Sequence, residues 1–212
     1  MQGTGGLVDR EVGPGRQKAD DELGRLLAAA ETVLVERGYE GLRVDDVLDA
    51  AGLSTRAFYR HFRGKSELFV ALFDREMTRA HQRLRAKLAA APTPEAKVEA
   101  WTAVMLALAY DSRIARRTRL FQVEQQVIAR EFPGEIARCI RLMLEPLEQA
   151  IEEGRVAGAF PGADPRRDAL AIHHLCTGLM IDRLLGIGSG LSRDNAVALA
   201  TRFALTTLRG AK

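Results

Sequence analysis

Residues 50–65, which read AAGLSTRAFYRHFRGK, combine basic, aromatic and hydroxyl side chains in one short stretch. This stretch carries four fixed positive charges, on Arg56, Arg60, Arg63 and Lys65, and it contains no acidic residue. The whole chain is nearly balanced, with 31 Lys and Arg residues against 28 Asp and Glu residues. Unpaired positive charge among aromatic and hydroxyl side chains is typical of a surface that binds DNA phosphates and base edges. The alternative interpretation is the solvated basic face of a structural helix.

The turn residues around this stretch predict a helix-turn-helix. A short helix from Val44 ends at Gly52, because glycine permits the left-handed backbone of a sharp turn. Leu53 fills the corner, and Ser54 stands where a serine caps the second short helix. Such a pair of helices places its second member in a major groove.

The second short helix is expected to separate apolar from polar side chains. Ala57, Phe58 and Phe62 can pack inward at helical spacing. The polar set is Ser54, Thr55, Arg56, Tyr59, Arg60, His61 and, at the start of the following helix, Lys65. Arginine reads guanine with two hydrogen bonds, hydroxyl groups bind phosphates, and a lysine at a helix N-terminus clamps a phosphate. We therefore expect this set to contact double-stranded DNA.

Helical periodicity continues along the rest of the chain, and no run alternates convincingly with a period of two. The sequence therefore predicts an all-α protein of about nine helices. Besides the two short helices, one runs from Asp20 or Asp21 to Gly38, and others cover 65–88, 94–110, 113–131, a segment ending near Glu153, 165–186 and 192–209. Thr93 as the cap with Pro94 in the first turn predicts the start of 94–110, and Asp164 with Pro165 predicts the start of 165–186. Pro146 falls inside one of them and should kink it, because proline lacks a backbone donor.

Composition excludes several classes of protein. With 212 residues, 47% of them hydrophobic, the chain can bury a sizeable core. The first 18 residues are glycine-rich and show no secretory signal, and no uncharged stretch is long enough to span a bilayer. We therefore expect a cytoplasmic protein without a membrane partner. Cys139 and Cys176 are far apart without metal-ligand spacing, so we expect reduced core thiols.

The last two predicted helices are unusually poor in charge. Residues 169–181 contain no Asp, Glu, Lys or Arg, and residues 196–208 contain only Arg202. A surface helix normally has one wide polar face, so each of these helices should be buried on more than one side. We expect a four-helix interface in a homodimer. The alternative is a pair of core helices in a monomer.

Several spaced segments resemble the signature of the tetracycline-repressor (TetR) family: 38–47, 50–54, 58–62 and 65–68. The resemblance covers about residues 20–75. The glycine-rich composition of residues 1–18 predicts a disordered tail. The resemblance implies a helix-turn-helix DNA-binding domain over 19–65 and a helical ligand-binding and dimerisation domain over 66–212. It also implies a dimeric transcriptional repressor that a small-molecule effector releases from a two-fold symmetric DNA operator.

Two positions depart from the family pattern. Arg43 stands where the family often has a threonine that caps the first short helix and touches phosphate. Arginine cannot cap, but it can reach a phosphate or a groove edge, so Arg43 joins the predicted DNA-binding residues. Arg56 stands where a small residue is common, and it should read a base and narrow the choice of operator.

The resemblance also implies where a small molecule binds. Trp101, Met105, Phe121, Met143 and Leu147 lie on helices that surround the effector cavity in the family, and His174 could donate a hydrogen bond there. Together they suggest an apolar or aromatic ligand. The alternative for each is a core position, since bulky apolar residues at helical spacing usually pack. A cluster of Arg113, Arg116, Arg117 and Arg119 is either a solvated face or part of the signal path.

Three classes of function remain to be compared. The first is the ligand-responsive DNA-binding repressor, and the second is a helical small-molecule-binding protein without specific DNA binding. The third is an α-helical enzyme, but no triad order or carboxylate pair supports catalysis. The adjacent His173 and His174 point about 100° apart on a helix, so we predict neither a metal pair nor any cofactor.

Overall fold

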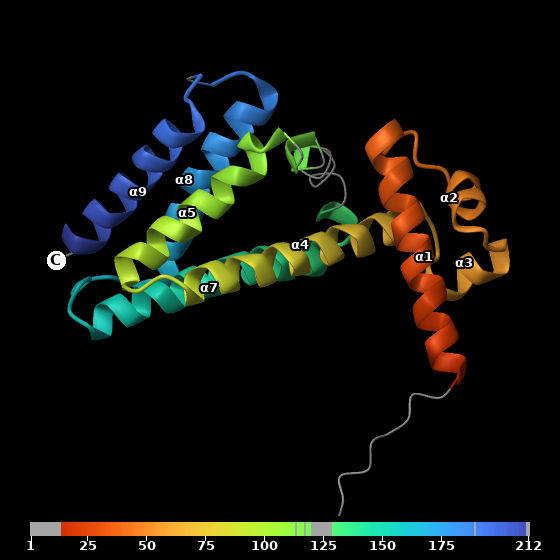
Figure 1. Cartoon of the computed structure of the whole chain (residues 1–212), viewed down its shortest axis with the longest axis horizontal. Helices are drawn as coiled ribbons and strands as arrows, with labels where there is room; N and C mark the ends of the chain where they lie inside the picture. Colours follow the sequence, from red (N-terminus) through yellow and green to blue (C-terminus); the bar gives the residue numbers. More distant parts are fainter. Residues whose placement is uncertain (1–13, 113, 117, 120–128, 189, 211–212) are drawn as a thin grey trace, which may run out of the picture. The chain divides into compact units, whose positions relative to one another are not determined.

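The computed structural model describes residues 14–112, 114–116, 118–119, 129–188 and 190–210. All regular structure within these residues is helical, which confirms the predicted all-α class. The helices are α1 (Pro14–Arg37), α2 (Val44–Ala51), α3 (Thr55–His61), α4 (Lys65–Ala89), α5 (Pro94–Tyr110), α7 (Pro133–Val156), α8 (Pro165–Leu185) and α9 (Arg193–Gly210) (Figure 1). The predicted helix over 113–131 falls mostly outside the described residues.

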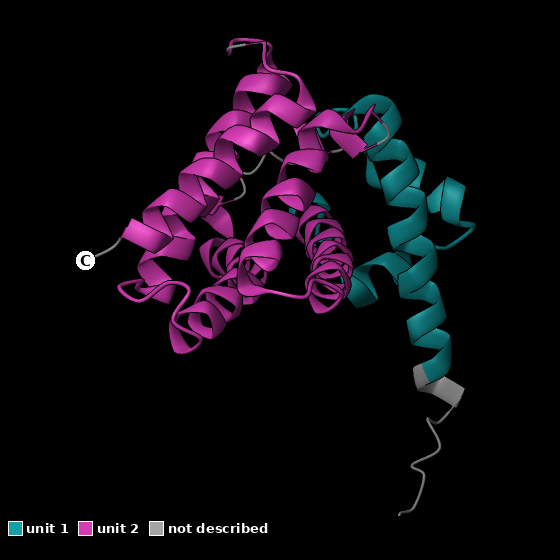
Figure 2. Ribbon diagram, turned by 60° about the vertical axis from the view of Figure 1, so that its left-hand side comes forward, with its two compact units in different colours: residues 1–68 teal, residues 69–212 magenta. Residues whose placement is uncertain are grey.

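The chain divides into two compact units, unit 1 (residues 1–68) and unit 2 (residues 69–212) (Figure 2). The boundary lies three residues after residue 65, where we expected the first domain to end. Helix α4 begins in unit 1 and continues in unit 2, so one helix contributes to both. Because α1 begins at Pro14, residues 14–18 of the expected tail are helical, and its first 13 residues lie outside the description.

Unit 1 is a three-helix domain in which α1 packs against α2 and α3. Leu26 and Leu34 of α1 are buried with Val47 of α2 and Phe58 of α3. Each helix therefore turns one apolar stripe toward a shared core. Gly38 ends α1 with a φ of 71°, and its N–H donates to the Leu34 carbonyl at 2.9 Å, as the sequence predicted for a terminating glycine.

In unit 2, helix α5 packs against α7, α8 and α9 (Figure 1). Its start follows the predicted signal: Thr93 Oγ1 accepts a hydrogen bond from the Ala96 N–H at 3.1 Å, and Pro94 occupies the first turn. Trp101, the single tryptophan of the chain, is fully buried, and its Nε1 donates to the Met143 carbonyl at 2.9 Å. The indole is thus satisfied within the core.

Pro146 lies inside α7 and leaves one carbonyl without its helical donor. Proline has no N–H, so the carbonyl of Leu142, four residues earlier, cannot accept the usual helical hydrogen bond. His81 of α4 occupies this position, with 2.6 Å between its Nδ1 and the Leu142 oxygen. Because a carbonyl oxygen only accepts, Nδ1 is the donor. The interruption of α7 is thereby converted into a link to α4.

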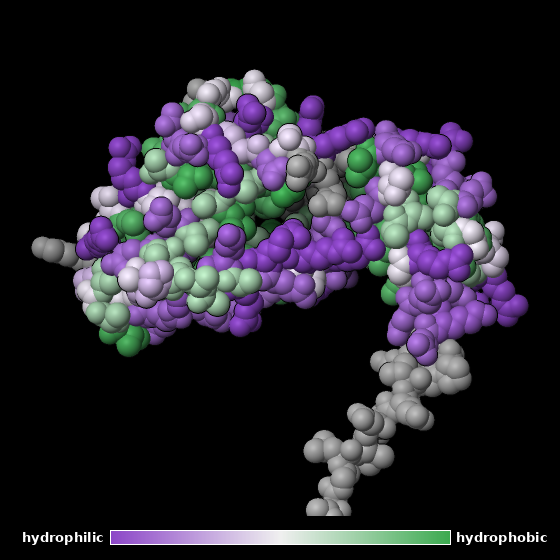
Figure 3. All heavy atoms as spheres, in the orientation of Figure 1, coloured by the Kyte–Doolittle hydropathy of each residue, from purple (hydrophilic) through white to green (hydrophobic). Residues whose placement is uncertain are grey.

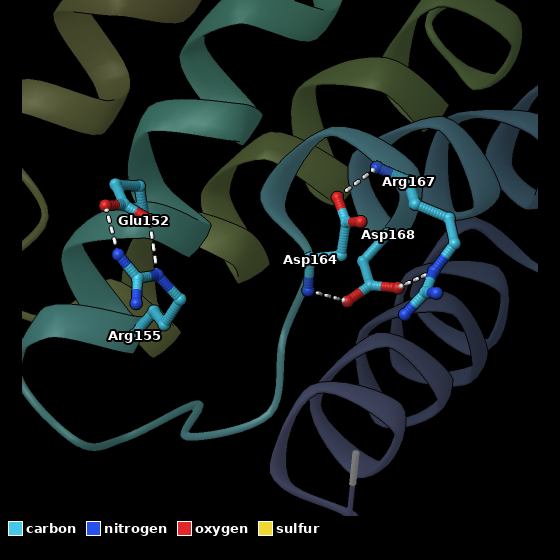
Figure 4. Close-up of polar contacts among 5 residues, drawn as sticks. All are labelled: Glu152, Arg155, Asp164, Arg167 and Asp168. Atoms are coloured by element: carbon cyan, nitrogen blue, oxygen red, sulfur yellow. Dashed lines mark hydrogen bonds and ion pairs between the residues drawn. The ribbon is translucent and has the colours of Figure 1, made fainter. Parts of the chain in front are cut away.

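The connection from α7 to α8 depends on two local features. Phe160 is fully buried, and a Cβ on Gly154 would lie 2.1 Å from its ring, so only glycine fits there. Asp164 caps α8, as predicted, by accepting from the Arg167 N–H at 3.0 Å, and Asp168 accepts from the Asp164 N–H at 2.9 Å (Figure 4). These reciprocal bonds fix the start of α8.

Helices α8 and α9 are buried along one side only within a single chain. On α8 the buried side includes Ile172, Cys176 and Met180, which follow at helical spacing. Apolar side chains on the other sides remain exposed, including Leu170 at 43% and Phe203 at 54%, and hydrophobic groups reach the surface along α9 in Figure 3. None of the helices described is long and apolar enough to cross a membrane.

Candidate functional site

The turn between α2 and α3 is held by a side chain of α1. Gly52 has a φ of 61°, the left-handed conformation that the sequence predicted. Arg25 donates hydrogen bonds through Nη2 to the carbonyls of Ala51 at 2.6 Å and Gly52 at 3.1 Å. Ser54 then caps α3 as predicted, because its Oγ accepts from the Ala57 N–H at 3.3 Å. These bonds fix the direction of α3 within unit 1.

Helix α3 separates its side chains as expected. Ala57 and Phe58 are buried, whereas Thr55 and Arg56 are exposed. Tyr59 is 60% exposed, and its ring meets the Phe58 ring edge-on, with 5.3 Å between the centroids. The tyrosine body is therefore anchored while its hydroxyl group is presented to solvent.

Arg60 and His61 face an acid that the sequence stretch itself does not contain. Glu22 of α1 is buried, with 8% of its side chain exposed, and its Oε2 lies 2.6 Å from Arg60 Nη1 and 3.6 Å from His61 Nε2. A buried carboxylate requires a nearby cation, and Arg60 supplies it. The sequence predicted that no acid lies near the DNA-binding residues, and this prediction is wrong for Arg60 and His61. Arg63 also lies near an acid, 3.7 Å from Glu67 in an exposed pair.

The other predicted cations have no acidic partner among the described residues. Arg43 precedes α2 with an extended backbone, makes no side-chain cap and is exposed. Arg56 is exposed in the first turn of α3. Lys65 begins α4, and its Nζ lies 4.1 Å from the centroid of the Tyr39 ring. These cations have no acidic partner in the described part of the chain to compete with an anionic one, and the Tyr39 ring attracts the Lys65 ammonium group through a cation–π contact.

Unit 2 contains a cavity of about 260 Å³ that is lined by residues of α4, α5, α7 and α8 together with Ile114 and Thr118. Most of the lining is apolar, and it includes Met77, Met105, Met143 and Met180. A mainly apolar pocket with a few polar groups is the usual form of a small-molecule site.

The polar groups at this cavity include Glu76, Arg83, His173, His174 and Thr177. Burial, helped by the neighbouring His174, lowers the pKa of His173 from 6.5 to about 4, so its imidazole is uncharged at neutral pH. The Nδ1 atom of His173 is buried and has no hydrogen-bond partner among the described residues. Glu76 is also buried, and its Oε1 accepts from Arg79 Nη1 at 2.8 Å.

Of the residues predicted to contact a ligand, Met105, Met143 and His174 line this cavity. Trp101 and Leu147 are fully buried in the core of unit 2 and are not among the lining residues. Phe121 lies outside the described residues, as do Arg113 and Arg117 of the arginine cluster, whose Arg116 and Arg119 are exposed.

Sequence reasoning missed the α4 side of the cavity, which is formed by Phe73, Met77 and Ala80 with the polar Glu76 and Arg83. The apolar residues of this set follow at helical spacing, which is also the pattern of an ordinary core stripe. The position of the methionines could have indicated this lining, because four of the five lie on helices predicted for unit 2. Methionine is over-used at adaptable binding surfaces.

We also searched the described residues for metal sites and reactive cysteines. They contain no group of three or more His, Cys, Asp or Glu side chains that could bind a metal ion. Cys139 and Cys176 are both free and buried, as predicted. Burial raises the pKa of the Cys176 thiol to about 12, which keeps it protonated and unreactive.

Residues 26–72 match the family model described as bacterial regulatory proteins, tetR family. The HTH-type transcriptional activator FasR of Mycolicibacterium smegmatis is 40% identical over 62 residues, which are 29% of this chain and 28% of FasR. The HTH-type transcriptional regulator CymR of Pseudomonas putida is 44% identical over 73 residues, which are 34% of this chain and 36% of CymR. The chain thus matches about a third of the length of these relatives, and the match lies in the N-terminal part.

Solved structures resemble the chain over a longer span. The reduced form of NemR from Escherichia coli gives a TM-score of 0.70 at 22% identity, covering 86% of this chain and 96% of NemR. The regulator FadR from Bacillus subtilis in complex with stearoyl-CoA gives a TM-score of 0.66 at 19% identity, covering 89% of this chain and 98% of FadR. At these identities the likeness establishes the fold.

Proposed function

Because its N-terminal domain places the chain in the TetR family, we propose that the protein is a ligand-responsive transcriptional repressor. It binds a two-fold symmetric DNA operator as a homodimer in the cytoplasm, and a small apolar or aromatic molecule releases it. The proposal includes no catalytic activity and no cofactor.

The observation that carries this proposal is a recognition face made of Arg43, Thr55, Arg56, Tyr59 and Lys65. The first four are exposed, Lys65 is half-buried over a tyrosine ring, and no acid among the described residues pairs with its cations. Residues at the start of the second helix of such a motif meet base edges, while flanking cations meet phosphates. The DNA supplies the negative charge that this face lacks.

Fluorescence anisotropy with DNA from upstream of the protein's own gene tests the proposal, with salt varied. We expect tight binding to a site with two-fold symmetry and an affinity that falls as salt rises. A reporter gene behind that site should be silenced by the protein. Weak binding that is indifferent to sequence would instead favour a helical small-molecule-binding protein.

The uncovered sides of α8 and α9 support the homodimer. Leu170 and Phe203 expose apolar surface that a second copy can cover in an isologous interface. Two recognition helices must then lie about 34–36 Å apart, or a multiple of that distance, to enter successive major grooves. Sedimentation should give a dimer for the unmodified protein and a monomer for Phe203→Glu. A clean monomer for the unmodified protein would contradict the proposal.

The cavity supports the effector. Helix α4 begins with Lys65 of the recognition face and later contributes Met77 and Ala80 to the cavity, so a ligand that displaces this helix acts on both. FadR from Bacillus subtilis, which has a similar fold, was solved with stearoyl-CoA bound. An effector that lowers DNA affinity must bind less tightly to the DNA-bound protein. Equal affinity for free and DNA-bound protein would contradict this mechanism.

A further inference from the structure

One buried polar atom at the cavity has no hydrogen-bond partner among the described residues. His173 lines the cavity, and its Nδ1 is buried without a hydrogen-bond partner in the part of the chain that the structure describes. A buried nitrogen without a partner raises the free energy of the folded state. A molecule in the adjacent cavity can supply the missing donor or acceptor.

The apolar part of the cavity is unusually rich in sulfur. Met77, Met105, Met143 and Met180 all line it, and the chain has only five methionines, of which the fifth is Met1. Methionine side chains are flexible and polarizable, and their sulfur atoms make favourable contacts with aromatic rings. This lining favours a flat aromatic ligand.

The charges around the cavity disfavour an anion near His173. Glu76 is buried, and its carboxylate already accepts from Arg79 at 2.8 Å. The Arg79 guanidinium offsets the charge of Glu76 and is engaged by it, and the imidazole of His173 carries no positive charge that could pair with an anion, since its pKa is lowered to about 4. Arg83 lines the cavity but is exposed, so solvent screens its charge.

We propose that the effector is an uncharged two-ring aromatic molecule with one hydroxyl group, and that this hydroxyl pairs with His173 Nδ1. A cavity of about 260 Å³ accommodates two fused rings with a small substituent. A hydroxyl group both donates and accepts, so it satisfies either tautomer of the neutral imidazole. The role of this molecule as an effector rests on the proposed function, whereas its binding to the cavity can be measured without DNA.

Three probes of matched shape test the proposal on the full chain by calorimetry: 1-naphthol, naphthalene and 1-naphthoate. We expect 1-naphthol to bind about tenfold more tightly than naphthalene, since it removes an unpaired buried atom. We expect 1-naphthoate to bind more weakly than 1-naphthol by about tenfold or more, because its charge loses hydration while Arg83, the cation among the described lining residues, is exposed and screened by solvent.

Variants at one position separate hydrogen bonding from shape. His173→Leu should abolish the preference for 1-naphthol over naphthalene while leaving naphthalene affinity within about twofold, because only the polar partner is lost. His173→Asn, which keeps a hydrogen-bonding group near the position of Nδ1, should retain the preference. If His173→Leu fails to fold, the asparagine variant and the probe series on the unmodified protein still decide.

Three results would overturn the proposal: equal binding of 1-naphthol and naphthalene, tighter binding of 1-naphthoate, or no binding of any probe at its solubility limit. DNA binding is measured separately by anisotropy. A protein that binds 1-naphthol as expected but no operator would contradict the proposed function and leave this inference standing. A protein that binds its operator but shows no hydroxyl preference would contradict this inference alone.

Discussion

The recognition face of unit 1 and the cavity of unit 2 are built in opposite ways. The recognition face comes from the short segment 43–65, and its arginines are exposed at the surface. The cavity collects side chains from Phe73 to Met180 on four helices, and its polar atoms include a buried histidine nitrogen. Local turns and caps, held by Arg25 of α1, therefore determine most of the first site, whereas packing between distant segments determines the second. Substitutions in the packed helices of unit 2 should accordingly have larger free-energy effects than substitutions on the recognition face.

The largest expected effect concerns the burial of His173. Folding lowers its pKa from 6.5 to about 4, so the unfolded chain binds more protons between these two values. The stability that this group contributes is fully present above pH 6.5 and is lost as the pH falls toward 4, by up to about 3 kcal/mol. Urea denaturation at neutral and acidic pH should show a smaller pH dependence for His173→Asn. If the unmodified protein and His173→Asn showed the same pH dependence, folding would not lower the pKa of the His173 imidazole.

Next in size is a pair of matched glycine substitutions, one in each unit. Gly154→Ala should destabilise unit 2 by about 2 kcal/mol, because the added Cβ meets the buried ring of Phe160. Gly24→Ala in α1 meets no atom within 4 Å, so alanine should add about 0.5–1 kcal/mol of helix stability there. Chemical denaturation measures both. Equal effects of the two substitutions would remove the contrast drawn between the units.

A third test concerns the hydrogen bond from His81 to the carbonyl of Leu142. His81→Leu should cost about 1–2 kcal/mol, since it leaves that carbonyl without a partner. In a Pro146→Ala background the same substitution should cost less, because alanine restores the helical N–H donor to Leu142. A double-mutant cycle on unfolding free energies measures the difference. Additive costs would show that proline and histidine act independently.

The smallest effects are expected on the recognition face. Arg56→Ala should relax preference at one base pair of each half-site by about 1 kcal/mol, the lower end for such contacts because an exposed side chain must be ordered. Lys65→Ala should weaken binding to all sequences alike and reduce the salt slope by about 1 per subunit. Anisotropy on the operator, on single-base variants and on random DNA separates the two. A uniform loss for Arg56→Ala would make Arg56 a phosphate contact.

Sequence alone predicted the elements that depend on neighbouring residues. Gly52 ends α2 in the left-handed conformation, Ser54 caps α3, and Thr93 with Pro94 starts α5, all as expected. Each of these signals acts over one helical turn, so no tertiary information is needed. The apolar side of α3, including the buried Phe58, followed from periodicity in the same way.

Sequence could not predict pairings that only the fold creates. Glu22 lies 38 residues before Arg60, and nothing local indicates that its carboxylate would be buried against the recognition helix. The burial of His173 Nδ1 without a partner among the described residues was also not predictable, because it depends on how the surrounding helices pack. The exclusion of any side chain at Gly154 depends on Phe160, which reaches it through the chain reversal after α7.

The bond between His81 and the turn interrupted by Pro146 has a consequence for how the sequence can drift. While proline stands in α7, the histidine is held by a carbonyl that no other described group is known to satisfy. If the proline is lost first, the carbonyl regains its own donor and the histidine becomes replaceable. If the histidine is lost first, the protein carries an unpaired carbonyl until the proline follows. Among descendants of this chain, replacement of the proline should therefore precede replacement of the histidine.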